Sequence, residues 1–208
     1  APDLSTSNRA TIGGMISTDA SGQGSVRYGK TRDHVISLKA VLLTGEEFNA
    51  RVISDAELDD LPKNSAEYRI GNALRDIHDS NRDEIAAGFP ELNRCLTGYD
   101  LKHLRTDDRE IDLNSVLCGS EGTLAFISEA VINLEPLPTE VALVAVQYES
   151  FMDALFDARE LMKYGATSIE TVDSKVLNLA MKDFIWDSVA EFFPQSDKSL
   201  QGINLVEF

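Results

Sequence analysis

The length, composition and charge of this chain exclude several classes of protein. Its 208 residues include 35 acidic and 19 basic side chains, and the net charge of −16 argues against a nucleic-acid partner, because such binding depends on neutralising phosphates. Hydrophobic residues make up 43% and charged residues 26%, as in ordinary globular domains, and no apolar run approaches the roughly 20 residues that cross a bilayer. We therefore expect no nucleic-acid partner, no integral membrane segment and a cytoplasmic location.

The chain opens with a glycine-rich segment, residues 8–22, which reads NRATIGGMISTDASG. Glycine has no Cβ, so the backbone there can approach another surface closely, and the hydroxyl and amide donors beside it suit a phosphate-bearing ligand. The residues alone leave an alternative open, in which this segment is a tight packing corner between a helix and a sheet and binds no ligand.

A charged cluster follows in the stretch 27–35, which reads RYGKTRDHV. Its charged members are Arg27, Arg32, Asp33 and His34. They could orient a carboxylate substrate or a cofactor. We favour the plainer interpretation, a surface turn with local ion pairs that each contribute about 0.2–1 kcal/mol.

The next stretch predicts a β-hairpin. Residues 35–43 are rich in β-branched and aliphatic side chains, and residues 48–53 resume the same pattern after the turn sequence TGEE at 44–47. Two such runs separated by a short glycine-containing turn are typical of two antiparallel strands.

Helices are expected after the hairpin. Residues 65–87 are polar with regularly spaced apolar positions, a pattern typical of helix, and we expect Gly71 and the cluster at 79–81 to divide it into two. The acid runs at 57–60 and 107–112 are predicted to be solvated loops.

The histidines and cysteines form no recognisable site. His34, His78 and His103 lack the spacing of a metal site, and His78 is expected to be exposed in its polar helix. Cys95 and Cys118 do not form a CxxC motif, and we predict that both are buried thiols.

A domain boundary is predicted after the next strand. Residues 123–134 alternate in part, which indicates a strand with one exposed face, and Pro136 and Pro138 then end it. We therefore divide the chain into a first domain, 1–138, and a second, 139–208.

The second domain is predicted to be a small α+β unit. Strands are expected at 141–148, 166–172 and 204–208, and helices from 151 to about 164 and at 174–181. Ser150 should cap the first helix and Gly165 should end it. Its buried face is expected to carry Phe151, Leu155, Ala158 and Met162. The β-α-β-α-β order suggests a ferredoxin-like or similar arrangement.

A second glycine-rich segment, residues 119–124, reads GSEGTL. Several segments occur in the order found in one known family: 8–22, 27–35, 89–94, 98–101, 119–124 and 126–138. Together they resemble the flavin-binding half of the FAD-linked oxidase and dehydrogenase family, whose fold is named after vanillyl-alcohol oxidase. The likeness is greatest to the D-2-hydroxyacid dehydrogenase branch, which acts on D-lactate, glycolate or D-2-hydroxyglutarate. Ala125 stands where the family usually has glycine, which weakens the expected contact there.

The resemblance implies an α+β fold: the second half of a vanillyl-alcohol-oxidase-type FAD-binding domain, with an antiparallel sheet flanked by helices, followed by the start of an α+β cap domain that holds the substrate. It also implies FAD as the cofactor. We expect no metal site in these residues, because the family's metal ligands lie further into the cap and C-terminal region. The cofactor contacts carried over from the family are Thr11, Gly13, Gly14, Thr18, Asp19, Ala20, Ser21, Glu121, Gly122, Thr123 and Ile127. The family's upstream glycine-rich loop and downstream catalytic histidines do not occur in these residues. We therefore expect a fragment that is inactive alone, binds FAD weakly or not at all, and contains no catalytic residue that we can name.

The parent protein, as the resemblance implies, oxidises a small D-2-hydroxy acid to a 2-oxo acid by hydride transfer to the flavin. The electron acceptor is not identified by the sequence. Two alternatives stay open. One is another FAD-linked oxidase, or an ether-lipid synthase, on the same scaffold. The other is a non-enzymatic α+β interaction module, in which the glycines serve only packing and the acidic surface contacts a basic partner.

Overall fold

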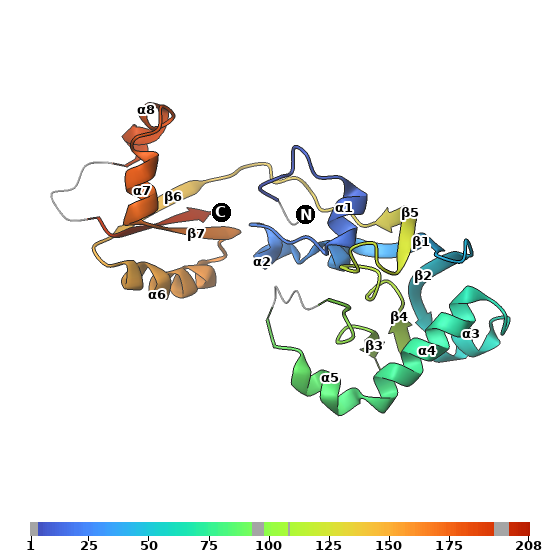
Figure 1. Ribbon diagram of the computed structural model, residues 1–208. Coiled ribbons are helices and arrows are strands. Elements are labelled where there is room, and N and C mark those ends of the chain that lie inside the picture. The colour runs from blue at the N-terminus through green and yellow to red at the C-terminus, as the bar shows by residue number, and fades with distance from the viewer. Residues whose placement is uncertain (1–3, 93–97, 108, 194–199) are drawn as a thin grey trace. The chain divides into compact units, whose positions relative to one another are not determined.

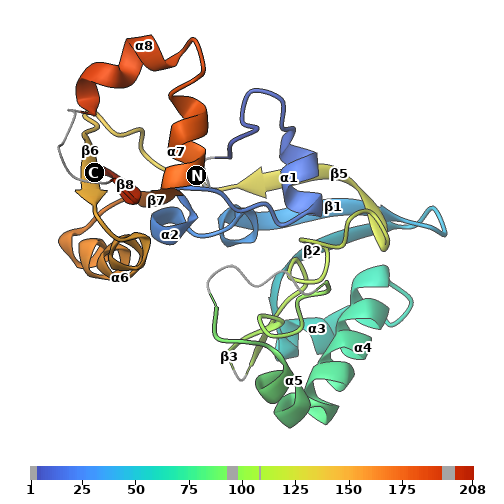
Figure 2. The same ribbon diagram turned by 60° about the vertical axis from the view of Figure 1, so that its left-hand side comes forward.

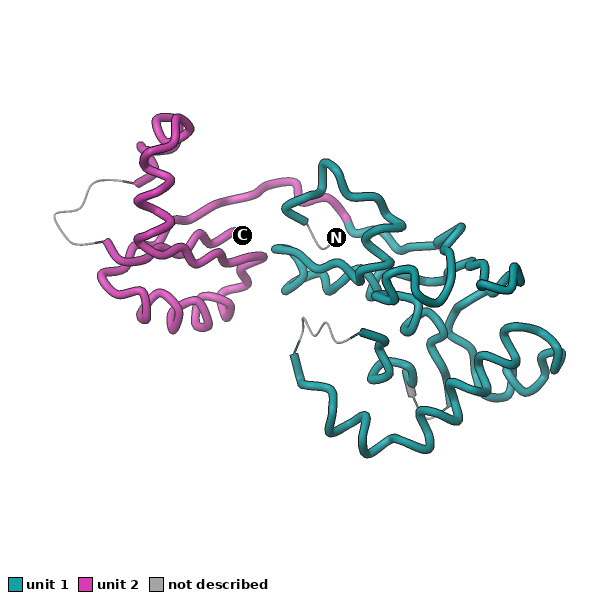
Figure 3. Tube along the Cα trace, in the orientation of Figure 1, with its two compact units in different colours: residues 1–135 teal, residues 136–208 magenta. Residues whose placement is uncertain are grey.

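The chain forms two compact units, coloured separately in Figure 3. The structure is a computed structural model and describes residues 4–92, 98–107, 109–193 and 200–208. Unit 1 comprises residues 1–135 and unit 2 residues 136–208. Each unit combines helices with its own antiparallel sheet, which confirms the predicted α+β class (Figure 1). Within the described residues, no helix is both long enough and apolar enough to cross a membrane.

Unit 1 is built on a five-stranded antiparallel sheet with strand order β3-β4-β2-β1-β5. Its strands are β1 (Val35–Leu42), β2 (Glu47–Ser54), β3 (Arg105–Asp107), β4 (Glu110–Asp112) and β5 (Ala125–Ile132). The short strands β3 and β4 fall in the acid-rich stretch that was expected to be a solvated loop, and that prediction was wrong. Ile111 of β4 is fully buried and attaches this stretch to the core.

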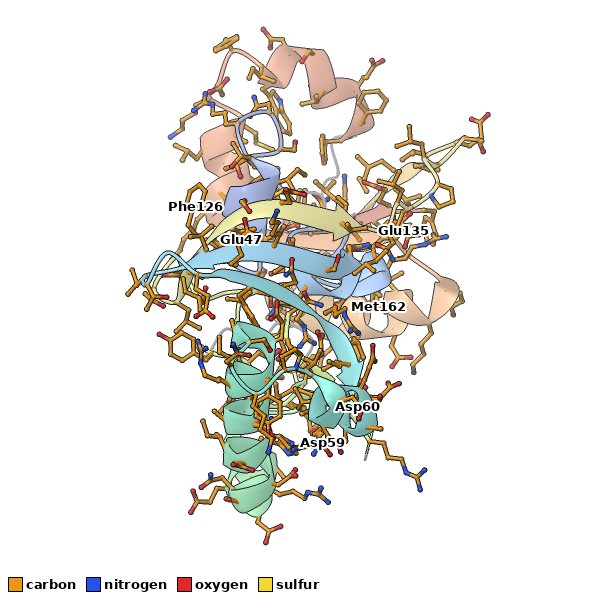
Figure 4. The ribbon with its side chains drawn as sticks, turned by 90° about the vertical axis from the view of Figure 1, so that its right-hand side faces the viewer. Glu47, Asp59, Asp60, Phe126, Glu135 and Met162 are labelled. Carbon is orange, nitrogen blue, oxygen red and sulfur yellow. The ribbon has the colours of Figure 1, made fainter. Side chains whose placement is uncertain are left out.

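The hairpin of β1 and β2 is confirmed. Gly45 in its turn has a φ of +82°, in the left-handed region that glycine adopts without strain. Val41 of β1 pairs with Glu47 of β2 on one side and with Phe126 of β5 on the other, and Figure 4 labels both partners. β5 forms the border of the sheet, because among the described strands it pairs with β1 alone.

The core of unit 1 lies on one face of this sheet. Leu38 and Ala40 are buried while their neighbour Lys39 is partly exposed, as the period of two in a strand requires. The same cluster includes Ile16, Phe48, Ala50, Ile53, Leu58, Leu104, Ile111, Leu113 and Cys118. Ile16 belongs to α1 (Ile12–Ser17), so the core anchors the first glycine-rich segment.

Three helices follow β2: α3 (Asp55–Asp60), α4 (Ala66–Ser80) and α5 (Arg82–Gly88). The acid run 57–60 was predicted to be a loop but lies in α3, whose end carries Asp59 and Asp60 in Figure 4. Ser54 caps this helix by accepting a hydrogen bond from the Glu57 N–H at 3.2 Å, which explains how an acidic hexapeptide becomes helical.

The predicted break of the longer helix is half correct. α4 ends at Ser80 as expected, but it runs through Gly71 without interruption. A Cβ at Gly71 would lie 2.6 Å from Leu58 Cδ1, so the glycine allows α4 to approach α3 closely.

Unit 2 has a three-stranded antiparallel sheet with strand order β6-β8-β7. Its elements are β6 (Leu143–Tyr148), α6 (Phe151–Leu161), η2 (Met162–Tyr164), β7 (Ser168–Asp173), α7 (Ser174–Ala180), α8 (Trp186–Val189), η3 (Ala190–Phe192) and β8 (Gly202–Glu207). The last strand lies between the first two, which is the split β-α-β arrangement of ferredoxin-like units. The predicted cap of α6 at Ser150 is confirmed. α6 itself ends at Leu161, and Gly165 ends the helical stretch one element later, as the C-cap of η2. On α6, Ala154 is buried and Leu155 is 43% exposed, so the expected buried face was misplaced at that residue.

A polar network centred on Asn204 joins the sheet of unit 2 to α6. Asn204 of β8 is fully buried; it donates to the Ala154 carbonyl at 2.9 Å and accepts from the Thr171 hydroxyl at 2.7 Å. The same amide donates to the Tyr148 hydroxyl at 3.2 Å, and that hydroxyl donates to Asp157. Every polar atom of Asn204 therefore has a partner.

Candidate functional site

The structure brings the two glycine-rich segments together. The Gly119 N–H donates to the Ile16 carbonyl at 3.0 Å, and the Glu121 N–H donates to the Ser17 carbonyl at 2.8 Å. Both carbonyls belong to α1, which lies beside β1 and β5 (Figure 1, Figure 2). Residues 8–22 and 119–124 therefore form one continuous surface held by backbone hydrogen bonds.

Gly13 and Gly14 differ in what their missing side chains would meet. Thr11 caps α1, and its Oγ1 accepts a hydrogen bond from the Gly14 N–H at 3.1 Å. A Cβ at Gly14 would lie 3.0 Å from that same oxygen, so glycine there serves the cap. A Cβ at Gly13 would meet no atom of the described residues within 4 Å, so Gly13 faces open space among them. The hydroxyl of Thr18 donates to the Gly14 carbonyl at 3.0 Å and closes the other end of the helix.

The loop after α1 is anchored by the residues that follow α2 (Ser25–Tyr28). Asp19 is buried; its carboxylate forms an ion pair with Lys30 and accepts from the Arg32 N–H at 3.0 Å. The Ala20 carbonyl accepts from Thr31 twice, from the N–H at 3.0 Å and from the hydroxyl at 2.7 Å. The polar atoms of Asp19 are therefore engaged within the protein. Ser21, also expected at the cofactor, is partly buried.

The second segment has an unusual backbone. Gly119, Glu121 and Gly122 have φ values of +83°, +52° and +75°. A Cβ at Gly122 would lie more than 4 Å from every described atom outside its own chain neighbours. The hydroxyl of Thr123 donates to the Ser120 carbonyl at 2.6 Å. Residues 121–123 are exposed, whereas Ser120 is buried and Gly119 is half-buried.

An open hollow of about 330 Å³ lies where the two segments meet. Four predicted cofactor residues line it: Thr18, Asp19, Glu121 and Thr123. The other predicted residues lie outside the lining: Thr11, Gly13, Gly14, Ala20, Ser21, Gly122 and Ile127.

Five further lining residues were not predicted as contacts: Gly98, Tyr99, Cys118, Gly119 and Ser120. The Tyr99 hydroxyl lies 2.9 Å from Thr123 Oγ1 and joins the 98–101 stretch to the second segment. Gly98 and Tyr99 belong to a segment that carried the family resemblance, so the signal was present in the sequence.

Ile127 occupies a different environment. It lies in β5 opposite Ala40 and is partly buried against the core of unit 1. The preceding Ala125, where the family usually has glycine, is buried in the same core. The strand therefore forms despite the larger residue.

The electrostatics of the hollow disfavour a reactive thiol. Burial, together with the carboxylates of Asp19 and Asp112, raises the pKa of the Cys118 thiol to about 12. The predicted burial of Cys118 is confirmed, whereas Cys95 lies outside the described residues. The hollow has no Lys, Arg or His in its described lining.

The charged cluster at 27–35 is not the local surface turn that we expected. Arg32 is largely buried and forms an ion pair with Asp100, which is distant in sequence, and His103 Nδ1 lies 2.9 Å from the same carboxylate. Burial alone would raise the pKa of Asp100, but the hydrogen bond from His103 and the charge of Arg32 together hold that pKa below its usual value. Arg27 is exposed above the Tyr28 ring, as a surface residue should be.

Two histidines are more buried than the sequence suggests. His78 is only 8% exposed, so its predicted exposure was wrong, and its Nδ1 lies 3.2 Å from Asp79 Oδ1. His34 is also buried, with Nδ1 2.7 Å from Asn133 Oδ1. Among the described residues, no group of three or more potential metal ligands is close enough to hold an ion.

Comparisons with known proteins agree with the resemblance. A sequence model of the FAD binding domain family matches residues 1–51. D-2-hydroxyglutarate dehydrogenase from Pseudomonas putida is 56% identical over 212 aligned residues, which cover 100% of this chain and 21% of that protein. The protein of the same name from Escherichia coli K12 is 50% identical over 211 residues, with coverage of 100% and 21%. The chain thus spans about a fifth of the length of these curated relatives.

Solved structures give the same fold. A structure of alkyldihydroxyacetonephosphate synthase matches with a TM-score of 0.55 at 17% identity and covers 96% of this chain and 28% of that one. At 17% identity the match shows similarity of fold alone. The sequence relatives assign the group: the chain belongs to the FAD-linked oxidase and dehydrogenase family, in its D-2-hydroxyacid dehydrogenase branch.

Proposed function

We propose that the full-length protein uses FAD to oxidise a D-2-hydroxy acid, with D-2-hydroxyglutarate the first candidate, to the corresponding 2-oxo acid. One observation carries the proposal: two glycine-rich segments, far apart in sequence, are joined backbone to backbone beside an open hollow. The relatives that match over the whole chain are named D-2-hydroxyglutarate dehydrogenases, which supports this choice of substrate.

The residues of the hollow suit an uncharged part of FAD. Its volume of about 330 Å³ lies at the lower end of the range for small-molecule sites, roughly 300–1,000 Å³, so it can hold part of a dinucleotide. Because its described lining contains acidic side chains and no cation, it favours a ring or a ribose over the pyrophosphate. Tyr99 supplies an aromatic face and Thr123 a hydroxyl for such a group.

The proposed cofactor residues fall into two groups. Thr18, Asp19, Glu121 and Thr123 line the hollow. Thr11, Gly13, Gly14, Ala20, Ser21 and Gly122 shape the backbone around it, and Ile127 supports the sheet behind it. In this proposal residues 1–138 belong to the FAD-binding domain and 139–208 to the cap domain that holds the substrate.

The chemistry divides between cofactor and protein. FAD, when bound, supplies the redox step by accepting a hydride equivalent from the substrate carbon. The described residues bind and orient the cofactor and keep its surroundings free of reactive groups, because the Cys118 thiol stays protonated. We assign no catalytic residue and no electron acceptor, and the cytoplasmic location stays a prediction of the sequence.

The direct test uses the full-length protein. Flavin absorbance at near-unit stoichiometry is expected in the purified protein, together with anaerobic bleaching by D-2-hydroxyglutarate and not by its L-enantiomer. Bleaching by D-lactate or glycolate instead would keep the reaction class and change the substrate. Bound flavin with no bleaching by any D-2-hydroxy acid would favour another oxidase or an ether-lipid synthase. A protein with no flavin would refute the proposal.

A glycine series tests whether the open backbone faces the cofactor. Gly13→Ala should leave stability unchanged or raise it by up to about 1 kcal/mol, because alanine favours helix and its Cβ meets nothing. Gly13→Leu should instead weaken FAD binding at least about tenfold by filling the cofactor's space. Gly88→Leu is the matched control, since Gly88 is also a helical glycine with open space around its Cβ.

The interaction-module alternative makes the opposite prediction. If the glycines served only packing, a side chain at Gly13 would lower stability with or without flavin. Within the described part of the chain, however, no atom lies within 4 Å of a Cβ placed at Gly13 or Gly122. We also infer that the 208-residue chain binds FAD weakly or not at all by itself. Tight, stoichiometric binding by this chain alone would contradict that inference.

A further inference from the structure

We propose that the buried ion pair between Asp19 and Lys30 is the positioning device that holds the loop after α1 in its ligand-ready shape. The inference rests on the proposed FAD site and assigns a role to Lys30, which neither the resemblance nor the comparisons single out. In this view, Asp19 acts through the backbone it fixes, although it lines the hollow.

The end of α1 explains why a special residue is needed at position 19. The Asp19 N–H donates to the Ile16 carbonyl at 3.1 Å, and the Ala20 N–H donates to the Met15 carbonyl at 2.8 Å. This pair of bonds is a Schellman motif, with position 19 in the left-handed conformation that glycine usually supplies. Asp19 has a φ of +44°, which a residue with a Cβ adopts only at a cost.

The side chain of Asp19 explains why the position is not glycine. One carboxylate oxygen accepts the Arg32 N–H at 3.0 Å, and the other pairs with the Lys30 ammonium. The side chains of Asp19 and Lys30 are each only 6% exposed. A buried charge without a partner is strongly unfavourable, so each of the two requires the other in place.

The same loop is fixed to the second glycine-rich segment. The Ile16 carbonyl that accepts the Asp19 N–H also accepts the Gly119 N–H at 3.0 Å. A Cβ at Gly119 would lie 3.3 Å from Asp19 Cβ, so the two backbones are in close contact. A displacement of Asp19 would therefore move both walls of the hollow.

Three variants in the full-length protein separate the roles. Lys30→Met leaves the Asp19 charge buried and unpaired, and should weaken FAD binding at least about tenfold and speed hydrogen exchange of the Arg32 and Gly119 amides in the apoprotein. Asp19→Gly allows the same backbone conformation but removes the carboxylate that contacts Lys30 and the Arg32 N–H. It should also weaken FAD binding and speed exchange of the two amides. Asp19→Asn combined with Lys30→Met removes both charges, keeps an acceptor for the Arg32 N–H, and should recover much of the loss.

Lys39→Met is the matched control. Lys39 also lies between two carboxylates, at 3.5 Å from Glu129 and 3.7 Å from Glu47, but on the partly exposed face of the sheet. It should change neither FAD binding nor exchange at Arg32. The same substitution is thus compared at a buried pair and at an exposed one.

The outcomes are decisive in each case. If Asp19→Gly binds FAD like the parent and its Arg32 amide stays protected, the proposal is wrong, because backbone conformation alone suffices. If Lys30→Met does not fold, FAD binding and amide exchange in Asp19→Gly and in the double variant still test the proposal. If the parent binds no FAD, the proposed function fails, whereas exchange in the apoprotein still tests the ion pair.

Discussion

Two buried polar clusters, one in each unit, can be compared directly. In unit 1 the Asp19–Lys30 ion pair lies beside Cys118, and in unit 2 the Tyr148 hydroxyl contacts Asp157 and Asn204. Burial and nearby carboxylates raise the pKa of Cys118 to about 12, and burial and Asp157 do the same for Tyr148. In both clusters burial and a carboxylate act in the same direction on a neighbouring acid, but the two clusters differ in the backbone that they hold.

The difference lies in the regularity of the surrounding structure. Asn204 lies in the central strand of a regular sheet, where its hydrogen bonds fix the helix against the strands. Asp19 lies in a left-handed turn beside an open hollow, where regular hydrogen bonding ends. In unit 2 a neutral amide, Asn204, holds regular packing, whereas in unit 1 a pair of buried charges holds an irregular backbone beside the hollow.

The largest expected effect concerns the Cys118 thiol. At about pH 8 its alkylation should be roughly a hundredfold slower than that of an unfolded cysteine. Its pKa of about 12, against an ordinary value of about 8.5, leaves far less thiolate, and the greater nucleophilicity of the remaining thiolate offsets only part of that loss. Mass spectrometry of the Cys118 peptide after iodoacetamide treatment measures the rate, with the denatured protein as the control. Fast labelling in the native protein would mean that the hollow is not the protected environment described.

The second prediction tests the polar network around Asn204 in unit 2. Asn204→Ala leaves the Ala154 carbonyl and the Thr171 hydroxyl without their partner, and should lower the free energy of unfolding of unit 2 on the order of 3 kcal/mol. Native-state hydrogen exchange of β8 peptides measures the loss. FAD affinity should stay unchanged. If it fell as much as in Lys30→Met, the distinction between the two clusters would be lost.

The third prediction concerns pH. The folded-state pKa of Asp100 lies below its unfolded value of about 3.9, so its charge stabilises the fold above that pH, and the stabilisation is lost as pH falls through the folded pKa. Asp100→Asn should lower the unfolding free energy by about 1.5–3 kcal/mol near neutral pH, and the difference from the parent should vanish in strong acid. Urea unfolding at several pH values measures it. The exposed Asp59→Asn is the control and should change stability by less than about 1 kcal/mol.

The smallest effect is expected on the open sheet face. Lys39→Met should change the unfolding free energy by less than about 1 kcal/mol, because its ion pairs with Glu47 and Glu129 are screened by water. Salt titration of the unfolding midpoint provides the measurement. A loss equal to that at Lys30 would show that burial is not what distinguishes the two lysines.

The regular parts of the fold were predictable, because their signal is local. The β1–β2 hairpin follows from two aliphatic runs around Gly45. The helical stretch of α6 and η2 follows from Ser150 before it and Gly165 after it. β3, β4 and α3 were missed because acidic residues are poor local indicators there. A cap at Ser54 and burial of Ile111 decide those elements instead.

The sequence indicated which segments form the candidate site, but not the side-chain contacts that hold them. The glycines marked two exposed backbone segments, and the family pattern implied that they meet. No sequence signal pairs Arg32 with Asp100 or Asp19 with Lys30, because those contacts depend on how α2 and the 98–104 stretch fold back. His78 lies in a polar helix, and its pattern of neighbours in the sequence gives no sign that the side chain is buried.

The position of β5 has a consequence for work with pieces of this protein. The strand AFISEAVI carries one charge in eight residues, Glu129, and within the described residues only β1 pairs with it. Such a border offers unpaired amide and carbonyl groups to any other extended chain. Preparations of isolated pieces should therefore self-associate through this strand, and a lysine at Ser128 would be a simple way to keep them dispersed.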